Sequence, residues 1–270
     1  MSEIKIVSID IDGTLINDER QIPLDVKSAV QQALAQDVKV VITTGRPLPG
    51  VRNILDELGI VGSEQYVITH NGGLMQTADG SQILFHAALD LAEYKELNTF
   101  MREQKTYIQA EDQFAAYTTN RLIHRWASFE NSLVNLPLHI VNNDNELEHV
   151  EIIKGIANAE SDDLDNVQAN VPTSISDKMS VIRSTANNLE FINKDASKGN
   201  ALEALAKALN VDIKNTMAIG DQENDYSMIE RAGLGVAMGN AIEKIKTIAD
   251  IETATNNDSG VARALEEYVL

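Results

Sequence analysis

Residues 4–15 of the chain read IKIVSIDIDGTL. The first half of this stretch is rich in β-branched residues and predicts a short strand at Ile4–Ile9, which runs directly into the carboxylates of Asp10 and Asp12. In extended backbone, positions i and i+2 point to the same side, so Asp10 and Asp12 can address one ligand. The stretch therefore predicts a strand that ends in a pair of acidic side chains.

Strands and helices alternate after this first strand. A helical pattern opens at Pro23, and Val38–Ile42 is an almost wholly apolar run, as expected of a strand that is buried on both faces. A second helix follows Pro47, and Tyr66–Thr69 is the third predicted strand. This alternation predicts an α/β fold in which helices cover both faces of a parallel sheet.

The C-terminal part of the chain repeats this alternation. Ser197 is expected to cap a helix. Strands are expected after it at Thr216–Ile219 and Leu234–Ala237, and helices at Asp225–Arg231, Ile242–Ile248 and Val261–Val269. We therefore expect residues 1–84 and 190–270 to form one discontinuous core domain.

The segment between these two parts has a different pattern. Expected helices at Asp90–Glu103, Asn120–Val134 and Glu146–Ala159 alternate with expected strands at Phe114–Thr118, His139–Val141 and Lys178–Ile182. We interpret residues 85–189 as an inserted α+β domain of ordinary size. The acidic stretch Ser161–Asn166 lacks the spacing and the glycine of a calcium-binding EF-hand, and it is expected to be a solvated loop.

Composition narrows the classes of function. The formal net charge of −19 disfavours binding to nucleic acid or to an anionic membrane; the acidic excess serves solubility or holds a cation, and composition alone favours solubility. The absence of cysteine excludes disulfides, cysteine-ligated zinc and thiol nucleophiles. No signal peptide pattern and no apolar run of about 18 residues is found, so we expect a cytoplasmic enzyme. The oligomeric state stays open, and a homodimer is one alternative.

Polar clusters follow four of the predicted core strands. They are Asp10–Thr14, Thr43–Arg46, His70–Gly73 and Gly220–Asp225, and Lys198 begins a predicted helix. Because ligands of open α/β sheets bind at the carboxyl ends of the strands, we expect these clusters to meet. The P-loop pattern is absent, which disfavours nucleotide binding of that kind.

The side chains of these clusters suit Mg²⁺ and a phosphate ester. Asp10, Asp221 and Asp225 offer the hard oxygen ligands that Mg²⁺ binds. Thr44 and the backbone N–H groups of a glycine-containing turn can hydrogen-bond to phosphate oxygens. Lys198 can neutralise negative charge on the group that is transferred.

The two aspartates of the first cluster also suit phosphoryl transfer. With a cation and Lys198 beside it, Asp10 can stay ionised and attack the phosphorus, which forms a covalent phosphoenzyme. Asp12 can give a proton to the leaving alkoxide and then take one from the attacking water. Asn224 fits as a partner that orients Lys198 or a metal ligand.

At these residues the chain resembles the haloacid dehalogenase-like superfamily, and within it the Cof-type sugar phosphatases. Five motifs match in the order of the family and span nearly the whole chain: Asp10–Leu15 (DIDGTL), Thr44–Pro47, Asn71–Gly73, Lys198–Leu202 and Gly220–Asp225. The resemblance implies a Rossmann-like three-layer core and a mobile cap of the C2 type, inserted between the third strand and Lys198.

The resemblance also implies the roles of single residues. Asp10 would be the nucleophile and a Mg²⁺ ligand, and Asp12 would be the general acid and base and would bind the metal through its backbone carbonyl. Thr44 and Lys198 would hold phosphate, and Asp221 would bind Mg²⁺. The expected site is completed by the phosphate- or substrate-binding residues Gly45, Arg46, Asn71 and Asn224 and by Asp225 as a further metal ligand. The implied activity is hydrolysis of sugar phosphates or similar small phosphorylated metabolites.

Other interpretations fit parts of this pattern. A phosphomutase would use the same phosphoenzyme, but the short stretch between Asp12 and the helix near Pro23 leaves no room for the small helical cap of those enzymes and favours hydrolysis. A receiver-like signalling module also has an aspartate beside Mg²⁺, but it is much smaller. Asp225 alone could be a helix cap, and Arg46 and Asn71 could each stabilise a turn.

Overall fold

A computed structural model describes residues 3–270, which split into two compact units. The first unit contains the chain up to Gly45, Arg52–Phe85 and Ser197–Leu270, and the second contains Arg46–Val51 and His86–Ala196. The second unit extends past the boundary expected at 189/190, because a strand at Asn188–Asn193 belongs wholly to it.

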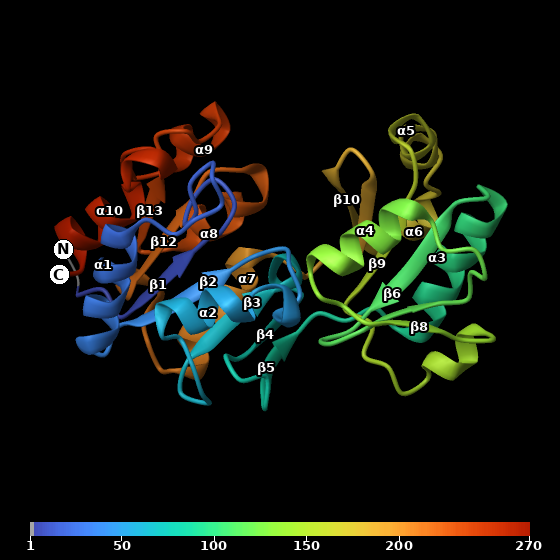
Figure 1. The fold of residues 1–270 in the computed structure, drawn as a ribbon, viewed down its shortest axis with the longest axis horizontal. Helices are drawn as coiled ribbons and strands as arrows, with labels where there is room; N and C mark the ends of the chain where they lie inside the picture. The colour runs from blue at the N-terminus through green and yellow to red at the C-terminus, as the bar shows by residue number, and fades with distance from the viewer. Residues whose placement is uncertain (1–2) are drawn as a thin grey trace. The chain divides into compact units, whose positions relative to one another are not determined.

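The first unit is built on a sheet with the strand order β14-β13-β12-β1-β2-β3-β4-β5 (Figure 1). Neighbouring strands from β14 to β3 are parallel, and β4 is antiparallel to β3. Every residue of β1 is buried, as the apolar run predicts. The strands are β1 Ile6–Ile9, β2 Lys39–Thr43, β3 Tyr66–Thr69, β4 Leu74–Thr77, β5 Ile83–His86, β12 Thr216–Gly220, β13 Leu234–Ala237 and β14 Ile251–Glu252.

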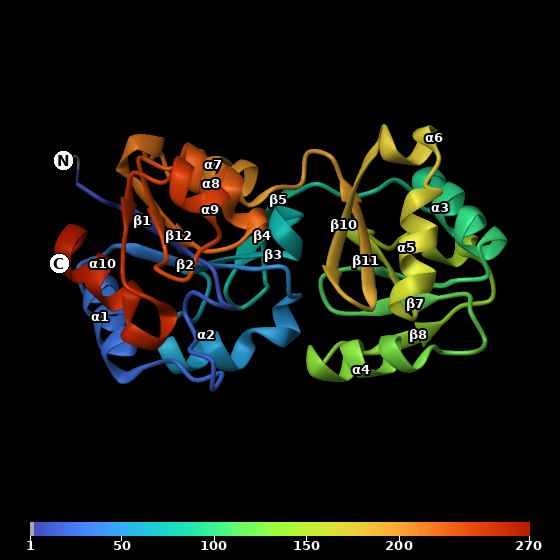
Figure 2. The ribbon, with the colours of Figure 1, turned by 90° about the horizontal axis from the view of Figure 1, so that it is seen from above.

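Helices cover both faces of this sheet (Figure 2). One layer contains α1 (Leu24–Ala35), α2 (Arg52–Leu58) and α10 (Gly260–Tyr268), and the other contains α7 (Lys198–Ala208), α8 (Tyr226–Arg231) and α9 (Glu243–Ile248). Short 3₁₀ turns lie at Leu48–Gly50, His70–Gly72, Ile213–Asn215, Glu223–Asp225 and Asn256–Asp258. Mainly Leu, Ile, Val and Ala fill the space between the layers. The three-layer α/β prediction is confirmed.

The second unit has a sheet in the order β10-β11-β9-β6-β7-β8, in which only the β7–β8 pair among the described strands is parallel. Helices α3, α5 and α6 pack on one face, and α4 lies on the other (Figure 2). The elements are α3 Leu91–Glu103, β6 Tyr107–Glu111, β7 Ala116–Thr118, α4 Arg125–Leu133, β8 Leu138–Ile140, a 3₁₀ turn at Asp144–Leu147, β9 Lys154–Asn158, α5 Ser161–Ala169, α6 Thr173–Ser176, β10 Met179–Thr185 and β11 Asn188–Asn193.

Two predictions for this unit are wrong. No α-helix forms at Glu146–Ala159. The end of a 3₁₀ turn and bends lie in its first half, and its second half contains β9, a central strand that pairs with β6 and β11, because a short apolar run does not by itself separate a strand from a helix. The solvated loop expected at Ser161–Asn166 is the start of α5. Its Asp162 and Asp163 occupy the first turn, where the helix dipole favours acidic side chains, and Leu164 is buried.

Other boundaries in the second unit move by a few residues. The helix expected at Asn120–Val134 begins only at Arg125, where the Nδ1 atom of His124 accepts a hydrogen bond from the Trp126 N–H (3.3 Å) and caps it. Capping by His124 has no strong sequence signal, since Ser, Thr, Asp and Asn are the usual caps. Within residues 3–270, no helix combines the length and the apolar character that a bilayer span requires.

Candidate active site

Three neighbouring strands of the first unit end at predicted site residues. Asp10 follows β1, Thr44 follows β2 and Asp221 follows β12, and both β2 and β12 pair in parallel with β1 (Figure 1). The ladder continues to these positions, since the Asp10 N–H donates to the Ile219 carbonyl (3.1 Å) and the Thr44 N–H to the Ile68 carbonyl (2.9 Å). Parallel strands therefore bring these clusters to one edge of the sheet.

A buried lysine connects two of the carboxylates. Lys198 is the first residue of α7, whose N-terminus is capped by Ser197 Oγ accepting from the Asn200 N–H (3.0 Å). Its Nζ atom donates to Asp10 Oδ1 at 2.5 Å and to Asp225 Oδ1 at 2.6 Å. Lys198 and Asp225 are almost completely buried, so these ion pairs are shielded from solvent.

The charges in this cluster shift one another's protonation. Burial raises the pKa of Asp10 to about 8, repulsion from Asp225 adds to the rise, and Lys198 opposes both. Burial acts to lower the pKa of Lys198, but attraction to Asp10 and Asp225 outweighs it and the pKa is raised. The lysine therefore stays charged, and Asp10 needs more positive charge nearby to be fully ionised at neutral pH.

Both carboxylate oxygens of Asp221 accept a hydrogen bond from a neighbouring side chain. Thr14 Oγ1 donates to Asp221 Oδ1 (2.9 Å), and Gln222 Nε2 donates to Asp221 Oδ2 (3.0 Å). Gly13 has a φ of +79°, and a Cβ atom there would lie 2.5 Å from Asp221 Oδ2. Only glycine fits this position, because its conformation is left-handed and the carboxylate occupies the space of a side chain.

The carboxylates fit a divalent cation. Asp10, Asp221 and Asp225 each offer an oxygen within 4.8 Å of the others, and all three are buried. Lys198 balances only part of their charge, and oxygen ligands of this kind suit Mg²⁺. Asp225 also has other partners: besides Lys198, its Oδ2 accepts from the N–H groups of Asp221 (2.9 Å) and Gln222 (3.0 Å).

Asn71 connects the Thr44–Pro47 motif with the Gly220–Asp225 motif. Its N–H donates to the Thr44 carbonyl (2.9 Å), and its Oδ1 accepts from Asn224 Nδ2 (3.1 Å). Asn71 has a φ of 56°, and the next residue, Gly72, has a φ of 88° and packs against Ser197, where a Cβ would lie 2.1 Å from the carbonyl oxygen. The hairpin between β3 and β4 thus supports both the turn at Thr44 and the start of α7.

Comparison with known sequences decides the family. The profile of the haloacid dehalogenase-like hydrolase family matches residues 7–265 of this chain. The chain belongs to the haloacid dehalogenase-like hydrolases. The resemblance drawn from the motifs, to this superfamily and its Cof-type branch, is confirmed, as is the prediction of a hydrolytic enzyme.

Individual haloacid dehalogenase-like relatives match along their full length. A protein of Streptococcus pyogenes named as a putative phosphatase is 42% identical over 267 residues, which cover 99% of each chain. The putative phosphatase YxeH of Bacillus subtilis is 36% identical, with 98% of each chain covered. A solved structure of a haloacid dehalogenase-like hydrolase from Bacteroides thetaiotaomicron has a TM-score of 0.87 at 27% identity, covering 98% of this chain and 99% of that one.

Four residues expected in the site are not buried: Asp12 and Asn224 are exposed, and Gly45 and Arg46 are half-buried. Asp12 is exposed, and its backbone forms a parallel bridge with Ile16. Arg46 belongs to the six-residue segment Arg46–Val51 that groups with the second unit, whereas Thr44 and Gly45 belong to the first.

Sequence reasoning gave no role to Thr14 and Gln222, although both hold Asp221. Each is adjacent to a motif aspartate or glycine, and that proximity was the only available signal. A hydroxyl and an amide beside a strand-end carboxylate can equally face solvent, so the pattern alone does not assign them.

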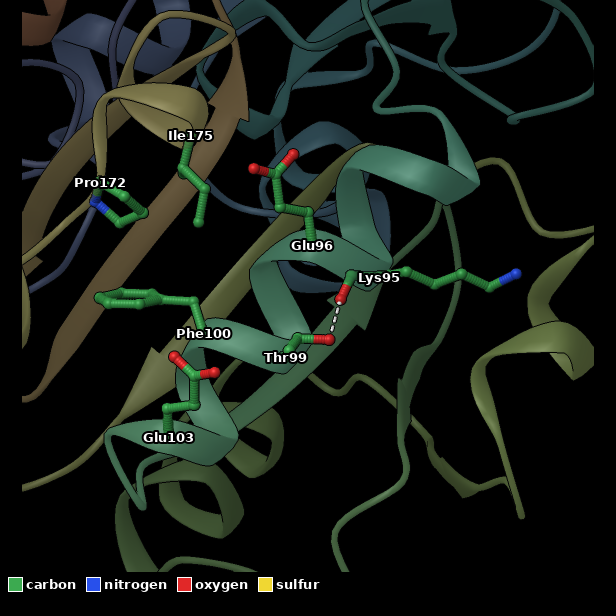
Figure 3. A pocket seen from close by; sticks show the side chains of 7 residues that line it. All are labelled: Lys95, Glu96, Thr99, Phe100, Glu103, Pro172 and Ile175. Carbon is green, nitrogen blue, oxygen red and sulfur yellow. Dashed lines mark hydrogen bonds between the residues drawn. The ribbon is translucent and has the colours of Figure 1, made fainter.

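The second unit contains a separate hollow of about 350 Å³ between α3 and the segment around α6 (Figure 3). Phe100 and Ile175 form its apolar wall, and Glu96 and Glu103 lie beside them, whereas Figure 3 shows Lys95 pointing away. Glu96 is already paired with Lys178 Nζ (3.2 Å), and Lys95, which alone is basic among the lining residues, points away, so the lining offers a phosphate ester no inward positive charge. This hollow is therefore not a candidate phosphate site.

Proposed function

We propose that the chain is a Mg²⁺-dependent phosphatase that hydrolyses sugar phosphates or similar small phosphorylated metabolites through an aspartyl-phosphate on Asp10. One observation carries this proposal: Lys198 is buried between Asp10 and Asp225, and the Asp221 carboxylate lies beside them at the same sheet edge. Family membership and relatives named as phosphatases agree with it.

The proposed cation site uses the carboxylates of Asp10 and Asp221, the backbone carbonyl of Asp12 and the charge of Asp225. When bound there, Mg²⁺ would supply positive charge to the phosphate oxygens and to the Asp10 carboxylate. Because Asp225 already accepts hydrogen bonds at both oxygens, its main contribution is to keep Lys198 and the Asp221 turn in place, and direct ligation by Asp225 would require it to share Oδ1 with Lys198.

The chemistry proceeds in two steps on this chain's own residues. A carboxylate oxygen of Asp10 attacks the phosphorus, the ester P–O bond breaks, and Asp12 protonates the leaving alkoxide. Asp12 then takes a proton from a water molecule whose oxygen attacks the same phosphorus, which releases inorganic phosphate and restores Asp10. Lys198 keeps its charge throughout and stabilises the phosphoryl oxygens.

The remaining residues hold the phosphate group and the loops. Thr44 and Gly45 would donate hydrogen bonds to phosphate oxygens from the turn after β2. Asn71 and Asn224 hydrogen-bond to each other and would keep this turn at a fixed distance from the Asp221 loop. Arg46, which belongs to the Arg46–Val51 segment of the second unit, would contact the substrate.

We assign the second unit as a C2-type cap that selects the substrate and excludes bulk water during the reaction. The partner is then a small phosphate ester, and nucleic acid and membrane play no part. Assignment to the cytoplasm rests on the sequence pattern alone, and the oligomeric state is a question for solution measurements.

Phosphate release tests the proposal. Wild-type protein is incubated with a panel of sugar phosphates and other phosphorylated metabolites, with Mg²⁺ or with excess chelator, and inorganic phosphate is measured. Asp10→Asn is expected to lower kcat by about 10⁴-fold or more, because the attacking oxygen is lost, while its circular dichroism spectrum stays native.

Full activity in chelator, or unchanged kcat in Asp10→Asn, would reject this mechanism. An isomerised sugar phosphate in place of inorganic phosphate would identify a mutase instead. A long-lived phosphorylated aspartate without turnover would favour a signalling module.

A further inference from the structure

The turn Met238–Ile242 follows β13 at the same sheet edge as the predicted site. Its five residues carry no charged side chain. The Met238 N–H donates to the Gly220 carbonyl (3.1 Å), and the Ile242 N–H donates to the Asp221 carbonyl (3.0 Å). Two backbone hydrogen bonds therefore fix this turn to the loop that carries Asp221.

A side chain from the same turn reaches the first motif. Asn240 Nδ2 donates to the Gly13 carbonyl oxygen at 2.8 Å. Gly13 lies against the Asp221 carboxylate on its other side, where a Cβ would be only 2.5 Å from Oδ2. Gly13 is thus held between Asp221, which lies against its α-carbon, and Asn240, which binds its carbonyl.

Asn256 fixes the position of Asn240. The Asn256 N–H donates to Asn240 Oδ1 (3.0 Å), and the Asn256 side chain donates from Nδ2 to the Ile16 carbonyl (3.1 Å). Asn256 is 5% exposed, whereas Asn240 itself is exposed. Both amides therefore hold carbonyl groups of the segment that follows Asp12, Gly13 at its start and Ile16 at its end.

We propose that Asn240, supported by Asn256, is a positioning residue that fixes the Asp12–Gly13 turn relative to Asp221. Glycine restricts its own backbone less than any other residue, and the hydrogen bond from Asn240 helps to hold the Gly13–Thr14 peptide in one orientation. This inference rests on the proposed function. There, the Asp12 carbonyl and the Asp221 carboxylate bind one cation, and the Asp12 carboxyl group protonates the leaving alkoxide.

The test compares Asn240→Ala with a matched control, Asn215→Ala. Asn215 also bridges β12 and β1 through a side-chain amide, since its Nδ2 donates to the Glu3 carbonyl (2.6 Å), but it lies at the amino ends of these strands. Mg²⁺ affinity is measured by calorimetry without substrate, and kcat and KM are measured by phosphate release.

Asn240→Ala is expected to weaken Mg²⁺ binding about tenfold and to lower kcat about 10–100-fold, because a partner behind the ligand shell is lost and the proton donor is misplaced. KM and the melting temperature without Mg²⁺ should stay close to those of Asn215→Ala.

Equal Mg²⁺ affinity and equal kcat in Asn240→Ala and Asn215→Ala would overturn the inference. The calorimetric arm separates this outcome from failure of the proposed function. If the wild-type protein binds Mg²⁺ but hydrolyses no ester, the proposed function fails, and a weaker affinity in Asn240→Ala alone still supports the positioning role.

Discussion

Each unit buries a lysine between two carboxylates, and the two clusters differ in a way that separates chemistry from structure. In the first unit Lys198 lies 2.5 Å from Asp10 and 2.6 Å from Asp225. In the second unit Lys154 lies 3.2 Å from Glu111 and 3.5 Å from Glu190. Both lysines are almost completely buried, so burial and charge pairing alone do not distinguish the two clusters.

The clusters differ in where their residues come from. Glu111, Lys154 and Glu190 lie on the neighbouring strands β6, β9 and β11, and Glu111 is directly opposite Lys154 in the register. Gln109 donates to Glu111 (2.9 Å) and exchanges hydrogen bonds with Asn131 of α4 (2.7 and 3.0 Å). This cluster is part of a regular sheet face whose amides are paired with one another.

The core cluster is built from strand ends and turns. Asp10, Lys198 and Asp225 come from three segments far apart in the sequence, a further carboxylate from Asp221 adds negative charge, and the exposed Asp12 lies next to them. A buried ion pair is weak evidence for function, because desolvation offsets much of its attraction. Unbalanced charge at an accessible sheet edge is the feature that points to a reaction.

The largest expected difference between the clusters comes from removing each lysine. Lys198→Met and Lys154→Met each leave two buried carboxylates without a counter-charge, so each should lower the free energy of unfolding by about 3–5 kcal/mol. Only Lys198→Met should also lower kcat, by about 10²–10³-fold, because Lys198 stabilises the phosphoryl oxygens. Urea titrations and phosphate-release assays on the folded fraction measure the two effects. A comparable loss of kcat in Lys154→Met would remove the distinction.

The gain in folding stability on addition of Mg²⁺ should also differ between the two clusters, but by a smaller amount. At about 100 times its dissociation constant, Mg²⁺ should stabilise the wild-type protein by about 2.7 kcal/mol, because it binds the folded state alone. Asp221→Asn should lose most of this gain, and its matched control Glu111→Gln should keep it. Thermal unfolding with Mg²⁺ and with chelator gives both values. If Glu111→Gln lost the response, the second cluster would itself belong to the cation site.

The dependence of stability on pH is the smallest expected difference. Burial raises the pKa of Glu111 above 4.5 in spite of Lys154, so the folded protein holds this proton more tightly than the unfolded chain does. The stability linked to this proton is fully present below pH 4.5 and is lost as the pH rises through the folded pKa. Glu111→Gln should therefore lose less stability than the wild type in urea titrations from acidic to neutral pH.

The pKa of Asp10 is likewise raised, from 3.8 to about 8. The stability linked to its proton should therefore be lost in metal-free protein as the pH rises from about 4 to about 8. Added Mg²⁺ should reverse the loss at Asp10 and leave the one at Glu111. If Mg²⁺ changed the pH dependence of the unfolding free energy equally in the wild type and in Asp10→Asn, the loss could not be assigned to Asp10.

Much of the core could be predicted from the sequence. β3 and β13 have the expected bounds, and β1, β2 and β12 shift by two residues or fewer. These strands are buried on both faces and therefore read as continuous apolar runs. The positions of Asp10, Asp221 and Lys198 at one edge of the sheet could be predicted for the same reason, since the first two directly follow strands and Lys198 begins α7.

The second unit was predicted less well because its sheet faces α4 with polar residues. In β6 and β9, Gln109, Glu111 and Lys154 alternate with apolar residues and are nevertheless buried, so the pattern resembles a solvated surface. The positioning contacts were also out of reach. Asn240 and Gly13 are distant in sequence, and an exposed asparagine in a turn gives no sign of the carbonyl that it meets.

The insertion of the second unit also affects how the enzyme emerges from the ribosome. β1, which leads to Asp10, pairs with β2 on one side and with β12 on the other, yet β12 begins only at Thr216. At roughly 5–20 residues per second, one edge of the central strand waits about 10–40 s for its partner during synthesis. Until then the nascent chain exposes an unpaired apolar strand, which is prone to aggregation, and it has no competent active site.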